Sequence, residues 1–184
     1  PELAAEKVIE VGADLGIAHD GDADRVILID EKGEIVEGDN IMAVAARAMI
    51  KENNLKNKTV VTTKYSNLGL KESLAEVGAD LVITKNGDRY VLAEMLKNDY
   101  KLGGEKSGHI IFSEYNTTGD GILTAAKIAS IIKKDNKPLS ELKKVMSYWP
   151  QILANVEVAK KDSWDKNNKV STKIKAAKAE IAGD

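Results

Sequence analysis

Short apolar runs alternate with longer amphipathic stretches along most of this 184-residue chain. Runs of a few residues that are rich in β-branched side chains and bounded by turn formers predict buried strands. Apolar residues spaced three and four apart predict helices. The strands are expected at 15–18, 26–29, 35–36, 59–63, 80–84, 100–102 and 109–113. The helices are expected at 1–11, 40–52, 66–77, 89–98, 120–134 and 170–181.

Strands and helices alternate regularly from about 36 to 146, which is typical of a layered α/β domain. We therefore expect an α/β fold with a mixed, largely parallel sheet and helices packed on it. Two of its helices are preceded by residues of the type that caps a helix, Asp39 and Ser66. A third helix is expected to begin near Asp120.

Composition sets limits on the compartment and on the partners. A formal net charge of −2 and a pI near 5.8 give no general attraction to nucleic acid or to an anionic membrane. The chain has no cysteine, which excludes disulfides and thiolate metal sites and agrees with a reducing compartment. No apolar run reaches the length of a membrane span, and the first residues lack the pattern of a signal peptide. We expect a cytoplasmic protein without nucleic-acid or membrane partners. Because it begins with Pro1 rather than Met, we expect a piece of a longer chain.

Three carboxylates and a guanidinium are crowded between the first two predicted strands, at Asp20, Asp22, Asp24 and Arg25. Carboxylates held this close repel one another, so either their pKa values rise or a cation lies among them. Oxygen ligands without cysteine or a histidine cluster suit a hard ion such as Mg²⁺. The planar fork of an arginine can bind a phosphate through two hydrogen bonds. We therefore expect a magnesium site that faces a phosphate.

Three other interpretations of these acids remain open. A calcium loop of the EF-hand type would add Glu31 as its twelfth residue, but it requires glycine at the position of Arg25 and helices on both sides. An aspartyl-phosphate phosphatase would use Asp20 as nucleophile and Asp22 as acid, without need of a third carboxylate. An exposed acidic turn without a ligand is the third alternative.

A glycine-rich stretch near the end of the α/β region carries Glu105, Ser107 and His109 at alternate positions. If the stretch is extended, its period of two turns all three side chains to one side. A carboxylate and a hydroxyl suit vicinal sugar hydroxyls, and an imidazole can move a proton. The alternative is a glycine-rich turn with Glu105 in solvent and His109 packed in the following strand.

Two further polar segments are candidates with weaker signals. The turn at 86–89 precedes a predicted helix, so Arg89 and free backbone N–H groups are available to an anion. A helix cap with a surface ion pair explains that turn nearly as well. His19 lies next to Asp20, but strand alternation is expected to point the imidazole away from the carboxylate.

Four motifs together resemble the α-D-phosphohexomutase superfamily, and within it the bacterial phosphoglucosamine mutases. They are DGDADR at 20–25, SNLGL at 66–70, GDRYV at 87–91, and GEKSGH at 104–109 followed by YNTTGDG at 115–121. Members have four domains and interconvert hexose 6-phosphates and 1-phosphates through a phosphoserine and a bisphosphorylated intermediate. The resemblance implies a phosphosugar substrate, one Mg²⁺ in each active site and a sugar bisphosphate activator, with a homodimer as the candidate assembly.

The resemblance also implies roles for the motif residues. Asp20, Asp22 and Asp24 would hold Mg²⁺, while Arg25 would face the phosphate and His109 would lie near the reacting end of the sugar. The remaining residues would bind substrate: Glu105 and Ser107 at sugar hydroxyls, and Gly87, Asp88 and Arg89 in a loop that orients the sugar phosphate. Lys106 stands where phosphoglucosamine mutases more usually have glutamine. Because it is next to Glu105 and Ser107, it could tune the choice of sugar.

The same resemblance implies three parts: the end of domain II with the metal loop at 1–36, a complete domain III at 37–148, and the start of a truncated domain IV at 151–184. The chain has neither the Ser-His-Asn-Pro type of phosphoserine loop nor the Arg-Pro-Ser-Gly-Thr type of phosphate loop. We therefore expect a fragment of a phosphoglucosamine mutase of the cell-wall precursor pathway that is inactive alone. A phosphomannomutase or phosphoglucomutase, and a non-catalytic sugar-phosphate binding module, are the alternatives.

Overall fold

The computed structural model describes residues 1–154, 157 and 166–181, in two compact units at 1–150 and 151–184. In the second unit the lysine-rich helix α7 spans Asn168–Ile181, close to its predicted range. Apolar and polar residues also alternate in the sequence at 152–158, but 155, 156 and 158 lie outside the described residues, and the others form no strand. No helix among the residues that the structure describes is long and apolar enough to cross a membrane.

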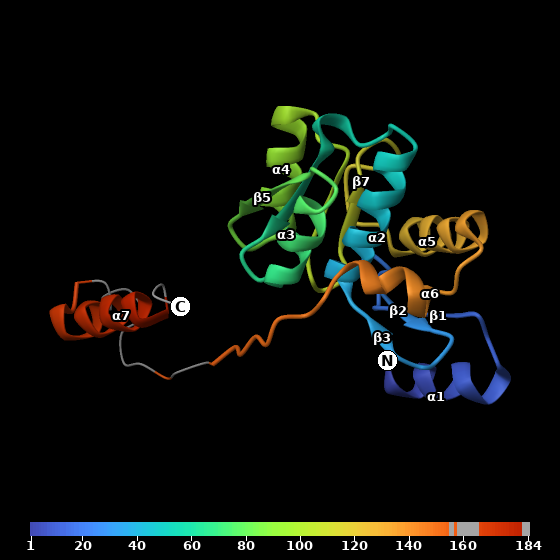
Figure 1. The fold of residues 1–184 in the computed structure, drawn as a ribbon, viewed down its shortest axis with the longest axis horizontal. Coiled ribbons are helices and arrows are strands. Elements are labelled where there is room, and N and C mark those ends of the chain that lie inside the picture. Colours follow the sequence, from blue (N-terminus) through green and yellow to red (C-terminus); the bar gives the residue numbers. More distant parts are fainter. Residues whose placement is uncertain (155–156, 158–165, 182–184) are drawn as a thin grey trace. The chain divides into compact units, whose positions relative to one another are not determined.

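The first unit contains two sheets and the helices that cover them (Figure 1). The strands are β1 Leu15–His19, β2 Val26–Asp30, β3 Ile35–Val36, β4 Thr59–Thr63, β5 Asp80–Thr84, β6 Leu102–Gly104 and β7 Ile110–Phe112. The α-helices are α1 Glu2–Val11, α2 Gly38–Lys51, α3 Leu68–Ala75, α4 Asp88–Asn98, α5 Gly121–Asp135 and α6 Leu139–Leu142. Short 3₁₀ turns lie at η1 Lys56–Lys58 and η2 Lys143–Val145.

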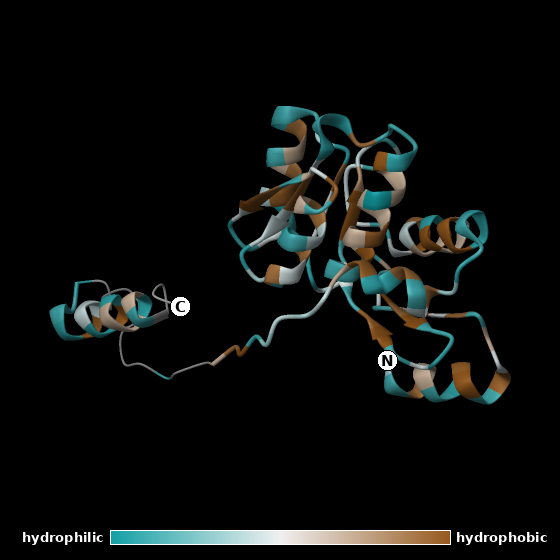
Figure 2. Cartoon of the chain, viewed as in Figure 1, coloured by the Kyte–Doolittle hydropathy of each residue, from teal (hydrophilic) through white to brown (hydrophobic). Residues whose placement is uncertain are grey.

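The larger sheet has the order β5-β4-β6-β7 and confirms the predicted fold class. Strand β4 pairs in parallel with β5 and β6, and β7 runs antiparallel to β6. Successive strand residues point to opposite faces, so Val60 packs with α2, α3 and α5 while Val61 packs with α4. The sheet is therefore the middle layer of an α/β/α sandwich, and both its strands and the helices around it carry strongly hydrophobic residues (Figure 2).

The smaller sheet is antiparallel, with β2 between β1 and β3, and α1 packs beside it (Figure 1). Val26 and Leu28 of β2 lie in the same hydrophobic core as Val60, so the two sheets share one interior. The expectation that the first two strands are both buried is wrong for β1, because Ile17 is 47% exposed. The shared core fixes β2, and with it the acidic loop that precedes β2.

A buried ion pair joins the small sheet to the end of the α/β layers. Asp30 is fully buried, and its carboxylate lies 2.7 Å from the ammonium of Lys143. Burial alone would raise the pKa of Asp30, but hydrogen bonds from Lys143 and from the backbone N–H groups of Glu34 and Lys32 lower it. The pairing compensates for the desolvation of this carboxylate.

Both predicted caps are wrong, for a tertiary reason. Asp39 lies inside the first turn of α2, is buried, and accepts a hydrogen bond of 2.7 Å from the backbone of Asn67. Asn67, not Ser66, caps α3, because its side chain accepts a hydrogen bond of 3.0 Å from Gly69. A partner distant in sequence decides the position of Asp39. Asp120 does cap α5, by accepting from the N–H of Leu123 at 2.8 Å.

The predicted strand at 100–102 lies two residues further along, at 102–104. Gly103 and Gly104 resemble loop residues in the sequence, but they belong to β6, where the absence of a side chain lets neighbouring atoms approach the backbone. A Cβ on Gly103 would lie 2.5 Å from the sulfur of Met95, and one on Gly104 would lie 2.5 Å from the carbonyl oxygen of His109. Glycine here serves packing rather than a turn.

Gly108 offers a test of how tightly the small sheet is fixed. Its φ is +93°, and a Cβ would lie 2.1 Å from the carbonyl oxygen of Val26. Gly78 has a φ of +65° but open space around it. We expect Gly78→Ala to cost about 1 kcal/mol of unfolding free energy through backbone strain, and Gly108→Ala at least about 3 kcal/mol, because backbone must also move. Urea unfolding followed by circular dichroism measures both; equal losses would contradict the tight contact.

Candidate active site

The acidic loop, residues 20–25, is the tip of the β1–β2 hairpin. Asp20, Asp22 and Asp24 each offer an oxygen, and these oxygens lie within 4.8 Å of one another. Ala23 adopts a left-handed backbone conformation with a φ of 59°. The structure thus brings together the three predicted metal ligands, two exposed and one half-buried.

Arg25 lies against this cluster. Its Nε is 3.8 Å from Oδ2 of Asp20 and 3.7 Å from Oδ1 of Asp24, and its backbone N–H donates to Asp20 at 3.3 Å. The side chain is 52% exposed. The guanidinium therefore neutralises part of the loop's charge and remains accessible to an anion.

Charge repulsion is visible at Asp24. Partial burial raises the pKa of Asp24, and the carboxylates of Asp22 and Asp20 raise it further, while His109 and Arg25 oppose the shift. A divalent cation among the three carboxylates would relieve this repulsion. The donor set consists of oxygens alone, which fits the preference of Mg²⁺. The residues of the loop therefore fit such an ion.

Backbone contacts from the α/β layers fix the loop. The N–H of Val26 donates to the carbonyl of Gly108 at 3.1 Å, and the N–H of Gly121 donates to the carbonyl of Ala23 at 2.9 Å. A Cβ on Gly121 would lie 2.6 Å from the carbonyl oxygen of Arg25. The sequence analysis gave no role to Gly108 or Gly121, although they belong to the motifs GEKSGH and YNTTGDG.

The 105–108 turn connects β6 to β7 and is not extended. Glu105 donates its N–H to the carbonyl of His109 at 3.0 Å, and Gly108 donates to the carbonyl of Glu105 at 3.0 Å. The premise that placed Glu105, Ser107 and His109 on one side is therefore wrong. Glu105 and Ser107 still meet, with the hydroxyl 3.5 Å from Oε2 of Glu105, and Ser107 is exposed.

His109 lies beneath the acidic loop instead of beside Ser107. It is 3% exposed, and its Nε2 is 3.5 Å from Oδ2 of Asp24. The same nitrogen accepts a hydrogen bond of 3.3 Å from the N–H of Gly119, and Nδ1 is buried without a partner among the described residues. The imidazole thus lies between Asp24 and the backbone of Gly119.

The 86–89 loop, which follows β5, reaches the 105–108 turn across the end of β4. The N–H of Gly87 donates to Oε1 of Glu105 at 3.1 Å, which orients that carboxylate. Asp88 and Arg89 are exposed in the first turn of α4, and the guanidinium of Arg89 stacks 4.7 Å from the ring centroid of Tyr90. His19 contacts the carbonyl of Arg25 at 3.2 Å.

The carboxyl edge of the parallel strands also carries basic residues that the sequence analysis did not single out. Lys64 follows β4 and Lys85 follows β5, and the pairing of Thr63 with Thr84 places both lysines at the same edge. Each ammonium lies over a tyrosine ring, at 5.5 Å for Lys64 and 5.9 Å for Lys85. Strand order was the signal that could have found them.

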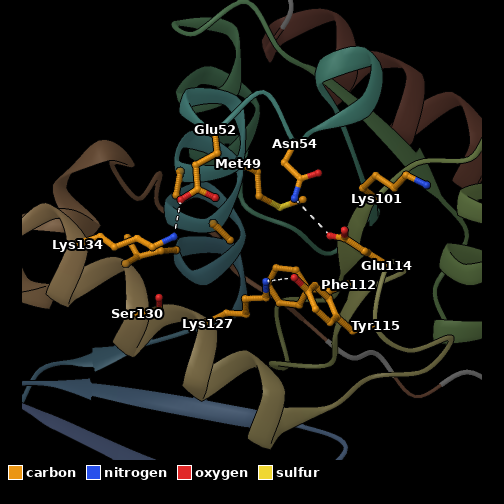
Figure 3. Close-up of a pocket in the computed structure, with 13 residues that line it drawn as sticks. Met49, Glu52, Asn54, Lys101, Phe112, Glu114, Tyr115, Lys127, Ser130 and Lys134 are labelled. Carbon is orange, nitrogen blue, oxygen red and sulfur yellow. Dashed lines mark hydrogen bonds and ion pairs between the residues drawn. The ribbon is translucent and has the colours of Figure 1, made fainter.

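Two hollows can be compared as substrate sites. The α2–α5 pocket lies between α2, the end of β7 and α5, and its cavity volume is about 60 Å³ (Figure 3). Pockets for small molecules usually measure about 300–1,000 Å³, so this one is too small for a hexose phosphate. Polar pairs also close its rim: Lys134 with Glu52, Lys127 with Tyr115, and Asn54 with Glu114.

The other hollow borders the acidic loop and has a volume of about 320 Å³. Asp20, Arg25 and Ser107 line it, together with His19 and the apolar side chains of Ala18 and Ile27. It therefore brings a metal-ligand candidate, a phosphate-binding candidate and a sugar-binding candidate to one space.

Comparison with known proteins gives a consistent result. Residues 37–148 match the family model described as phosphoglucomutase/phosphomannomutase, alpha/beta/alpha domain III. The phosphoglucosamine mutase of Symbiobacterium thermophilum is 51% identical over 183 residues, and that of Brevibacillus brevis is 48% identical over 184 residues. Each alignment covers 100% of this chain, and the chain spans 41% of the length of each relative.

Solved structures share the fold. A putative phosphomannomutase from Thermus thermophilus superposes with a TM-score of 0.71 at 24% identity, over 77% of this chain and 32% of that one. The Aspergillus fumigatus N-acetylphosphoglucosamine mutase in complex with GlcNAc-6P and magnesium gives a TM-score of 0.67 at 23% identity, over 80% of this chain and 38% of that one.

The acidic loop should respond to divalent cations. We expect millimolar MgCl₂ or MnCl₂ to raise the melting temperature of the chain by several degrees, because saturation at a hundred times Kd stabilises by about 2.7 kcal/mol. Asp22→Asn should abolish most of the increase, since it removes a ligand. Asp80→Asn, at an exposed aspartate at the start of β5, is the control and should respond like the unchanged chain. An equal response of Asp22→Asn would exclude this loop as the site. Differential scanning calorimetry measures the shift.

Proposed function

The chain belongs to the phosphoglucomutase/phosphomannomutase family through the domain III at residues 37–148, and on this premise we propose that it is part of a Mg²⁺-dependent phosphoglucosamine mutase. Such an enzyme interconverts glucosamine 6-phosphate and glucosamine 1-phosphate. The observation that carries the proposal is the hydrogen bond of 3.1 Å from Val26 to Gly108, which joins the acidic loop to the 105–108 turn. The phosphoglucosamine mutases at about half identity support the choice of sugar.

The proposed division of the chain follows from this function. Residues 1–36 would be the end of domain II and supply the acidic loop, and residues 151–184 would begin domain IV. The reactive phosphoserine and the second phosphate-binding loop would come from parts of the protein outside this chain. We therefore propose that the chain alone retains the metal and sugar sites without turnover.

Phosphoryl transfer depends mainly on positioning and on neutralising charge on oxygen. A Mg²⁺ ion bound by Asp20, Asp22 and Asp24 would supply that neutralisation at the phosphate. Arg25 is half-exposed beside these acids, so its guanidinium can bind the remaining phosphate oxygens. The loop of Gly87, Asp88 and Arg89 would orient the other phosphate.

The sugar must turn over between the two transfers so that each end meets the phosphoserine. Hydrogen bonds to hydroxyls near the middle of the sugar ring can form in both orientations. Glu105 is oriented by the N–H of Gly87, and Ser107 lines the hollow beside Asp20. These two side chains would accept and donate hydrogen bonds to sugar hydroxyls in either pose.

His109 supports the site from below. Its burial and its contacts with Asp24 and Gly119 favour a role in packing the acidic loop against the residues that precede α5. The role of His109 as a proton carrier at the sugar remains a prediction. We further propose a cytoplasmic enzyme, activated by a sugar bisphosphate, whose product enters amino-sugar nucleotide and cell-wall precursor synthesis. A homodimer remains a prediction.

A mutase assay on the complete reading frame tests the function. With Mg²⁺ and a trace of sugar bisphosphate, we expect conversion of glucosamine 6-phosphate to glucosamine 1-phosphate and slower turnover of mannose and glucose phosphates. Glu105→Gln should lower kcat/KM about 10–100-fold, because a charged acceptor for a sugar hydroxyl contributes about 1.5–3 kcal/mol. Glu114→Gln, at the α2–α5 pocket, should leave kcat/KM unchanged.

Two outcomes would contradict the proposal. The first is a folded, phosphorylated protein that converts no hexose phosphate, which would favour a sugar-phosphate binding module. The second is metal-dependent release of inorganic phosphate that Asp20→Asn abolishes, which would favour the aspartyl-phosphate phosphatase.

A further inference from the structure

Lys106 lies between the two proposed sugar-binding residues, but its ammonium contacts other parts of the fold. It is 3.5 Å from Oε2 of Glu37 and 5.9 Å from the ring centroid of Tyr148. The side chain is 33% exposed. These two contacts direct the ammonium of Lys106 toward the start of α2 and toward Tyr148.

Glu37 belongs to the start of α2, which also holds the backbone of the turn. The N–H of Gly38 donates to the carbonyl of Lys106 at 3.0 Å. A Cβ on Gly38 would lie 2.1 Å from the carbonyl oxygen of Glu105. The helix terminus therefore touches the turn directly, and the ion pair of Lys106 with Glu37 adds a side-chain contact to the same junction.

Tyr148 connects this junction to the exit segment, residues 146–149, through which the chain leaves the α/β layers. Its ring centroid lies 5.9 Å from the ammonium of Lys106, and partial burial together with the carboxylates of Glu37 and Asp39 raises the pKa of Tyr148. Lys106 of the turn thus contacts both a carboxylate at the start of α2 and an aromatic ring of the exit segment.

The exit segment is itself held to α3. The side-chain amide of Asn67 donates to the carbonyl of Trp149 at 2.8 Å and accepts from its N–H at 3.0 Å. The indole N–H of Trp149 donates to Glu72 at 2.6 Å. The exit segment is thus fixed at Trp149, and Tyr148 is the residue next to Trp149.

We propose that Lys106 is a positioning residue for the reaction proposed above: through Glu37 and Tyr148 it ties the 105–108 turn to the exit segment, and so sets the placement of Glu105 and Ser107. The inference rests on the proposed function. It gives Lys106 no contact with the sugar. Substituting Lys106 changes the affinity for sugar phosphates without changing which sugar is preferred.

Steady-state kinetics on the complete reading frame test this role. Lys106→Met and Glu37→Gln should each raise KM for glucosamine 6-phosphate about fivefold or more with a smaller change in kcat. The double variant should be no worse than either single variant, because both remove the same contact. Lys106→Arg keeps the charge and should restore most of the affinity.

Two controls separate positioning from general damage. Lys51→Met removes an ion pair of 2.6 Å with Asp135, and should leave KM unchanged. Exposed ion pairs contribute little to stability, so the melting temperatures of Lys106→Met and Lys51→Met should differ by no more than about 2 °C. The ratio of kcat/KM for glucosamine 6-phosphate to that for glucose 6-phosphate should stay constant in every variant.

The outcomes are distinguishable. If the protein without substitutions has no mutase activity, both the proposed function and this inference are overturned. An active protein in which Lys106→Met leaves KM unchanged overturns the inference alone. A changed ratio between the two sugars, or additive effects of Lys106→Met and Glu37→Gln, would also overturn it, because they show that Lys106 acts on the sugar or independently of Glu37.

Discussion

The hydrogen bond from Val26 to the carbonyl of Gly108 joins the tip of the small sheet to the edge of the large one. Gly108 has a φ of +93° and no room for a side chain, so the two backbones are in direct contact. The carbonyl of Ala23 receives a second such bond from Gly121 at the start of α5. Because backbone groups rather than long side chains make these contacts, the acidic loop and the 105–108 turn are held in a fixed relation. The proposed metal, phosphate and sugar sites all depend on that relation.

Electrostatics add a second constraint. Three carboxylates with oxygens within 4.8 Å of one another are unfavourable without a cation, and the pKa of Asp24 is raised first by its partial burial and then by the charges of Asp22 and Asp20. Arg25 offsets part of the repulsion, while the shared hydrophobic core keeps β2 from moving away. The ion pair of Asp30 with Lys143 anchors the opposite end of β2. Here the fold holds three mutually repelling carboxylates in place. Such an arrangement is expected where a bound cation contributes to function and not only to folding.

Sequence patterns predict the layers well and the contacts between them poorly. The strands at 59–63 and 80–84 are predicted to the residue, because β-branched runs flanked by turn formers depend on local preference. The position of Asp39 and the cap at Asn67 depend on each other across the fold, so local capping rules miss both. The acidic cluster is predictable because its spacing is itself a local signal. The burial of His109 is one of two alternatives that the sequence leaves open, because it depends on the turn at Gly108 and on the loop at Gly119.

Anomalous diffraction from crystals of this chain grown with Mn²⁺ and glucosamine 6-phosphate would test most directly whether the acidic loop and the 105–108 turn form one site. We predict a manganese peak bounded by Asp20, Asp22 and Asp24, with the sugar phosphate in the hollow beside Arg25 and a sugar hydroxyl within hydrogen-bond distance of Glu105 or Ser107. Manganese bound elsewhere, or a sugar phosphate bound away from the 105–108 turn while the ion occupies the loop, would contradict it.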